Sequence, residues 1–237
     1  MTTPTFRTTR WSLVARATGD DHAAAARALG ELCELYWYPL YAFLRRTGRA
    51  DVDAMDVVQS FCGELLEHGA IHGAAAQRGP FRHYLLGALR HFSANASRHA
   101  RAQKRGGGAL QWSLDDAAER FAAEPAARGT PEQEFARRWA EALLARAMQR
   151  LRDEYAERGR GEVLTALEPA LLGDDAAVPH AAVAARLGTT EGAVKVALHR
   201  LRARTGELIR AEIAETLDDP AAVEDELREL FAALAAK

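Results

Sequence analysis

Apolar residues recur at helical spacing along most of this chain, and no segment alternates apolar and polar residues as a half-buried strand does. The same segments are rich in alanine, leucine, arginine and glutamate, which favour helices. The pattern predicts an all-α protein with two small helical domains, at residues 20–105 and 130–215. A flexible linker is expected between them at 106–129, and an acidic amphipathic helix is expected in the C-terminal extension, 216–237.

Three helices are predicted in the first domain. The first covers residues 21–47, where Pro39 should kink or divide the helix and Gly48 should end it. The second covers residues 52–67, with apolar residues at the spacing of one buried face and acidic residues on the opposite face. The third runs from about residue 80 to 105, and its second half is polar and cationic.

The second domain should begin with a well-capped helix. Thr130 can cap it, Pro131 suits its first position, and Gln133 completes a capping box with Thr130. A short helix is predicted to follow at 161–172.

Residues 179–204, PHAAVAARLGTTEGAVKVALHRLRAR, have the spacing of a helix-turn-helix. Ala184 is small enough to let the second helix approach the first, and Gly188 permits a positive φ in the turn. Val194 should pack into the angle between the helices, and Thr190 should cap the second helix.

The second helix of this segment is apolar on one face and cationic on the other. An α-helix fits the major groove of DNA, where Arg and Lys contact phosphates or guanine edges. We expect Lys195, His199 and Arg202 to lie opposite the core, with Arg200 and Arg204 on the flanks. The candidate DNA contacts are therefore Thr190, Lys195, His199, Arg200, Arg202 and Arg204.

Charge is unevenly distributed along the chain, although the net charge is only −2. No Asp or Glu occurs between His68 and Leu114, whereas the C-terminal extension is strongly acidic. Separated basic and acidic segments favour charged partners. Cys33 and Cys62 are widely spaced and are expected to be reduced thiols in a core.

The chain is expected to be a cytoplasmic protein without a membrane segment, because no apolar run approaches the roughly 20 residues that cross a bilayer. Its glycine-rich stretch, KRGGGAL, lacks the Lys-Ser/Thr of a phosphate-binding loop. No catalytic arrangement stands out. We therefore expect a binding protein rather than an enzyme, with no cofactor and no metal.

Three segments, in order, resemble the extracytoplasmic-function sigma factors, the small two-domain members of the sigma-70 family. DAMDVVQSF, at residues 53–61, resembles the family's DAEDLVQ-type segment. Residues 79–105, GPFRHYLLGALRHFSANASRHARAQKR, resemble its promoter-melting and −10-reading segment. Residues 188–204 resemble its −35-reading helix-turn-helix. The resemblance covers about residues 20–215.

This resemblance implies an all-helical factor that binds core RNA polymerase and directs transcription initiation at promoter DNA. The cationic helix of residues 191–204 would read the −35 element. The residues implied in core polymerase contact are Asp53, Asp56 and Gln59. Those implied at the −10 element are Arg90, His91, Asn95, Arg98, Arg101, Lys104 and Arg105.

The chain departs from the family pattern at four positions. Met55 stands where the family usually has Glu, which weakens the acidic docking face. His91 replaces a common Asn, Asn95 a common Asp and Cys62 a usual Phe.

Two other functions remain open from the sequence. The chain is alternatively a free-standing helix-turn-helix regulator that does not bind polymerase, or an all-helical enzyme or adaptor with solvated basic residues. The C-terminal extension is expected to pack on the second domain. A competing hypothesis is that its acidic face screens the basic helix or docks a regulator, and an anti-sigma factor would be a partner of that kind.

Overall fold

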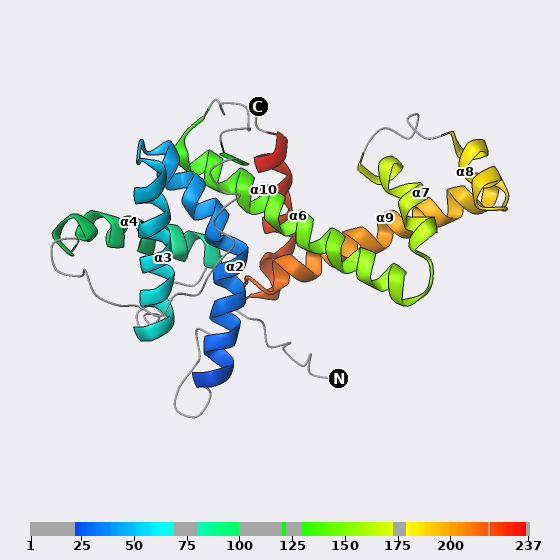
Figure 1. Ribbon diagram of the computed structural model, residues 1–237. Helices are drawn as coiled ribbons and strands as arrows, with labels where there is room; N and C mark the ends of the chain where they lie inside the picture. The colour runs from blue at the N-terminus through cyan, green and yellow to red at the C-terminus, as the bar shows by residue number, and fades with distance from the viewer. Residues whose placement is uncertain are drawn as a thin grey trace. The chain divides into compact units, whose positions relative to one another are not determined.

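The computed structural model describes residues 22–68, 80–99, 120–121, 129–172, 179–217 and 219–235 (Figure 1). All regular structure in these ranges is helical, which confirms the all-α prediction. The contacts divide the chain into two compact units. Unit 1 comprises Met1–Ala142 and Ile213–Lys237, and unit 2 comprises Leu143–Glu212.

Unit 1 contains the three predicted helices of the first domain, α2 (His22–Arg46), α3 (Asp51–His68) and α4 (Phe81–His99). Pro39 lies inside α2 and does not divide it. The predicted apolar face of α2 is buried, and it includes Leu32, Tyr36 and Leu40.

A polar cluster holds the connection between α2 and α3. Tyr41 donates a hydrogen bond to Asp51, and the Arg45 guanidinium contacts the Asp51 carboxylate at 2.7 Å. Burial, followed by the hydrogen bond with Asp51, raises the pKa of Tyr41 to about 12. Gly48 ends α2 with a φ of 90°, as predicted. The Arg49 amide reaches back to the Leu44 carbonyl, which completes a Schellman motif.

The two cysteines are buried and unbridged in unit 1, in agreement with the prediction of core thiols. A hydrogen bond with Cys62, together with burial, raises the pKa of the Cys33 thiol. Both side chains therefore act as small core residues.

The core of unit 1 also takes in part of the predicted second domain. The long helix α6 (Pro131–Glu157) contributes its residues up to Ala142 to this unit. Phe135 stacks on Tyr36 with ring centroids 6.3 Å apart, and Trp139 is fully buried. These aromatic side chains are removed from water within unit 1, which includes α6 as far as Ala142.

Most of the predicted linker, 106–129, lies outside the described residues. Two residues within it, Arg120 and Phe121, contact α2. The Phe121 ring packs edge-on against Tyr41 at 5.9 Å, and the Arg120 guanidinium lies 4.0 Å from the centroid of the Tyr38 ring. This part of the linker is therefore attached to unit 1.

The C-terminal extension forms a short 3-10 helix, η4 (Pro220–Ala222), and the helix α10 (Val223–Ala235). The amphipathic helix is present, and its expected packing on the second domain, residues 130–215, stays a prediction. It belongs to unit 1, where Leu230 is fully buried and the Glu226 carboxylate pairs with Arg82 of α4. The hypothesis that its acidic face screens the basic helix or docks a regulator stays a prediction.

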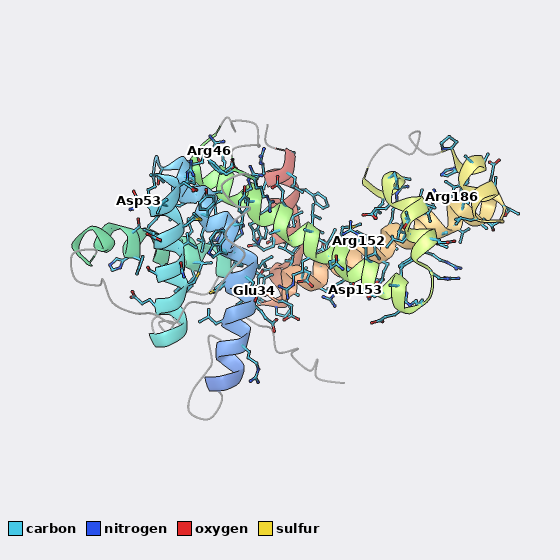
Figure 2. All side chains as sticks on the ribbon, in the orientation of Figure 1. Glu34, Arg46, Asp53, Arg152, Asp153 and Arg186 are labelled. Atoms are coloured by element: carbon cyan, nitrogen blue, oxygen red, sulfur yellow. The ribbon has the colours of Figure 1, made fainter. Side chains whose placement is uncertain are left out.

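Unit 2 contains the rest of α6 followed by α7 (Gly161–Leu172), α8 (His180–Arg186) and all but the last two residues of α9 (Glu191–Ala214). The bounds of α7 match the prediction. Arg152 of α6, labelled in Figure 2, pairs with Glu168 of α7. The unit's apolar core includes Leu143, Leu151, Leu164, Leu167, Val194, Leu198, Leu201 and Leu208.

Within the described ranges, no helix is both long enough and apolar enough to span a bilayer.

Candidate nucleic-acid interface

The turn between α8 and α9 depends on Gly188. Its φ is 62°, a value that residues with a side chain adopt only with strain. The Thr189 amide donates to the Ala184 carbonyl at 2.9 Å, and the Gly188 amide donates to the Ala185 carbonyl at 3.4 Å. These two bonds form a Schellman motif, which ends α8 and sets the direction in which α9 begins.

Thr190 caps the start of α9, as predicted. Its hydroxyl oxygen accepts a hydrogen bond from the Ala193 amide at 3.2 Å. Glu191 lies in the first turn, where a carboxylate is favourable beside the positive end of the helix dipole. Ala184 and Val194 are buried at the angle between the two helices, which is the packing that the sequence predicts.

The outward face of α9 combines cationic side chains with one exposed apolar side chain. Lys195, His199 and Arg202 are exposed, as the sequence predicts, and Arg200 is exposed as well. Val196 lies on the same face and is 50% exposed. Sequence reasoning missed Val196, although the helical period places it opposite the buried Val194 and Leu198. We call Lys195, Val196, His199 and Arg200 the α9 outward face.

Two of the predicted DNA contacts are engaged within unit 2. Arg202 donates to the Ala170 carbonyl near the end of α7, at 3.0 Å. Arg204 forms salt bridges with Glu154 and Glu207, at 2.5 and 2.7 Å. The hydrogen bonds with Glu154 and then Glu207 raise the pKa of Arg204 further above its ordinary value. These two side chains therefore brace α9 against α7 and α6.

The outward face of α3 carries the predicted polymerase contacts. Asp53, labelled in Figure 2, is exposed, as is Asp56; Gln59 is half-buried, and Ala54 and Val58 are buried on the opposite face. Val52 is 64% exposed beside these carboxylates. Acidic and apolar side chains thus lie together on one helix surface.

Arg90 and His91 are exposed on α4, as expected for residues that contact DNA. Arg90 forms an ion pair with Glu132 in the first turn of α6, and its guanidinium lies 5.4 Å from the centroid of the Phe43 ring. Sequence reasoning missed this pairing, because no local pattern signals it. α4 extends to His99, but the side chains of Asn95 and Arg98 lie outside the described set, as do Arg101, Lys104 and Arg105 entirely.

An open pocket of about 650 Å³ lies beside Arg90 in unit 1. Its other cationic residue, Arg49, donates to the Ser93 hydroxyl at 2.5 Å. Its lining consists of Phe43, Leu44, Thr47, Gly48, Arg49, Arg90, Ser93, Ala94 and Glu132. The pocket thus combines two guanidinium groups with an aromatic ring and hydroxyls, beside the carboxylate of Glu132.

A scan of protein-family models gives no match, and searches of curated proteins and of solved structures give no significant match. In the described part of the chain, no group of three or more His, Cys, Asp or Glu side chains is arranged to hold a metal ion.

Proposed function

We propose that this chain is a sigma factor of the extracytoplasmic-function type. In this proposal it binds core RNA polymerase through α3 and recognises promoter DNA through α4 and α9. The observation that carries the proposal is the α9 outward face, which lies on the second helix of a helix-turn-helix whose turn depends on Gly188. The order of the three family-like segments along the chain supports the same function.

The α9 outward face has the chemistry needed to read a major groove. Lys195 and Arg200 would contact phosphates or guanine edges, and the exposed methyl groups of Val196 would contact the methyl group of thymine. Gly192 and Ala193 are exposed beside them and are small, so that the start of α9 can approach the DNA backbone closely.

The outward face of α3 would dock on polymerase. Asp53 and Asp56 would give the encounter its speed and register, because charge complementarity contributes more to these than to affinity. The exposed Val52 would supply apolar contact area. The acidic face is reduced at Met55, which is half-buried, so that Val52, Asp53 and Asp56 would bear most of the contact.

The first experiment is run-off transcription with purified core RNA polymerase and a library of genomic promoters. The proposal predicts transcripts that depend on the added chain. Replacing Lys195 and Arg200 with Ala should weaken promoter binding. It should also lower the salt slope, which is the steepness with which the logarithm of the binding constant falls with the logarithm of the salt concentration, by about one for each side chain that no longer reaches a phosphate. The matched control is Arg228→Ala, which removes an exposed charge from α10 of unit 1 and should leave both quantities unchanged.

A pull-down with core polymerase separates the proposal from the free-standing regulator. The sigma factor should be retained by core enzyme, and Asp53→Ala with Asp56→Ala should reduce retention. Specific DNA binding without retention of the wild-type chain would instead establish the regulator. If DNA binding is absent or does not depend on salt, both the sigma-factor proposal and the free-standing regulator are refuted.

A further inference from the structure

The first turn of α4 is held by the C-terminal segment of the chain. The Phe81 amide donates to the Thr216 carbonyl at 3.1 Å. Arg82 donates from Nε to one carboxylate oxygen of Glu226 at 2.9 Å and from Nη2 to the other at 3.2 Å. Residues far apart in the sequence therefore fix both the backbone and a side chain where α4 begins.

The Arg82–Glu226 pair is almost fully shielded from water. The side chains are 9% and 4% exposed. The Arg82 guanidinium also lies 4.7 Å from the centroid of the buried Trp139 ring of α6. A buried ion pair is costly to break on one side, because the remaining charge is left without a partner. Separating α10 from α4 would therefore leave a buried charge without its partner.

Apolar packing around the pair leaves little freedom for movement. Ile213 and Leu230 are fully buried, and Leu217 nearly so. Tyr36 of α2 is fully buried and contacts Phe81 edge-on, with ring centroids 5.2 Å apart. Close-packed interiors transmit displacement, so a shift of α10 would be passed to the start of α4.

We propose that the C-terminal segment, residues 213–235, positions α4 for promoter opening, and that Glu226 is a positioning residue that acts through Arg82. The inference rests on the proposed function, because it assigns to α4 the opening of DNA. A helix of this length amplifies small changes at its start: a tilt of about 5° at Arg82 moves the far end of α4, about 26 Å away, by about 2 Å. Such a displacement would move the later turns of α4, which include Arg90, relative to the DNA strand.

The structural half of the inference is tested on the full-length free protein by hydrogen exchange. Glu226→Gln should accelerate exchange of the amides in the first turns of α4, residues 81–89, while α8 and α9 keep their protection. The matched control is Glu212→Gln, which removes the charge of another buried carboxylate that pairs with Arg146 and Arg150 in unit 2. The control should loosen unit 2 and leave α4 protected. Unchanged exchange in α4 of the Glu226 variant would overturn the inference.

The functional half is tested by transcription from two templates with the same promoter, one fully duplex and one with the −10 region already unpaired. Glu226→Gln should slow opening of the duplex promoter by about tenfold and leave transcription from the unpaired template near the wild-type level. Equal loss on both templates, or no loss on either, would overturn the positioning role. An inactive wild-type chain on both templates would instead refute the sigma-factor proposal itself.

A second variant guards against a general loss of folding. Replacing the pair with apolar side chains, Arg82→Met with Glu226→Leu, removes the charges together and avoids an unpaired one. If α10 acts by docking, this double variant should recover protection of α4 and most of the duplex activity. Recovery of protection without recovery of activity would show that the position of α4 is not what limits opening, and would also overturn the inference.

Discussion

Arg90 of α4 is paired with Glu132, which lies in the first turn of α6, and the Phe43 ring of α2 packs against the same guanidinium. A carboxylate thus lies where the proposed function would place a phosphate or a base of the −10 strand. The capping box holds that carboxylate in place. The Thr130 amide donates to the Gln133 side chain at 2.9 Å, and the Gln133 amide donates to the Thr130 hydroxyl at 3.3 Å.

Glu132→Gln is therefore expected to strengthen binding of single-stranded −10 DNA by about threefold to tenfold at low salt. The exposed ion pair with Arg90 is worth at most about 1 kcal/mol, and its loss also removes a negative charge that faces the DNA. Fluorescence anisotropy with a labelled oligonucleotide measures the change. Glu162→Gln, at the equivalent first-turn position of α7 in unit 2, is the control and should leave affinity unchanged. Unaltered affinity in the Glu132 variant would mean that Arg90 does not meet the strand.

The exposed Val196 side chain predicts that the α9 outward face prefers thymine in the −35 element. Removing a thymine methyl group from its contact, by substituting deoxyuridine in the −35 element, should weaken wild-type binding by about fourfold, since a buried methylene-sized group is worth about 0.8 kcal/mol. Val196→Ala should bind both DNAs with nearly equal affinity. A variant that still discriminates between thymine and deoxyuridine would exclude Val196 from the contact.

Arg204 and Arg200 should separate stability from DNA binding. Arg204→Ala breaks the bridges to Glu154 and Glu207 and should lower the melting temperature of unit 2 by about 1–4 °C, with little effect on the salt slope of DNA binding. Arg200→Ala should do the reverse, because that side chain is exposed on the outward face. Calorimetry measures the melting temperature of both variants, and a salt titration measures the salt slope of DNA binding for both. A lower salt slope for Arg204→Ala would show that Arg204 does contact the DNA.

The Glu154–Arg204 bridge also predicts a pH dependence. The hydrogen bond from Arg204 holds the pKa of Glu154 below its ordinary value of 4.5. A carboxyl with a lowered pKa in the folded state contributes stability above the ordinary value, and that contribution disappears as the pH falls through the lowered pKa. Acidification below about pH 4.5 should therefore destabilise the wild-type chain more than Arg204→Ala. Parallel loss of stability in both proteins would contradict this assignment.

Gly188 and Gly192 should respond in opposite directions to the same substitution. An added Cβ meets no neighbour within 4 Å at Gly188 and only an ordinary contact at Gly192, so steric crowding does not decide either case. Gly188→Ala must adopt a φ of 62° and should destabilise unit 2 by about 1–2 kcal/mol. Gly192→Ala, inside α9, should stabilise it by up to about 1 kcal/mol. Urea unfolding measures both, and a stabilising Gly188→Ala would refute the role given to that φ.

Local features of this fold are readable from the sequence, because their causes lie within one or two helical turns. The capping box at Thr130, the cap at Thr190 and the turn at Gly188 all follow from neighbouring residues. The outward position of Lys195 and His199 follows from the helical period in the same way. Even Val196 could have been found by completing the helical wheel.

Features that depend on distant partners could not be read in this way. Glu226 belongs to an acidic run that is typical of a solvated face, and its buried state depends on Arg82, 144 residues earlier. Arg204 looks like another cation of the DNA-facing helix until Glu154 of α6 is placed beside it. The capping box at Thr130 predicts correctly where α6 begins. It does not show that Phe135 and Trp139 pack in unit 1, because a helix can begin in one unit and end in another.

The interrupted sequence of unit 1 has a consequence for the order of folding during synthesis. The ribosome makes Arg82 early and Glu226 only after all of unit 2, since residues 143–212 lie between the two parts of unit 1. The first part of unit 1 therefore cannot pack against α10 until all of unit 2 has been made. During that interval the start of α4 lacks its contacts with Thr216 and Glu226, and ribosome pausing before residue 226 would lengthen the interval.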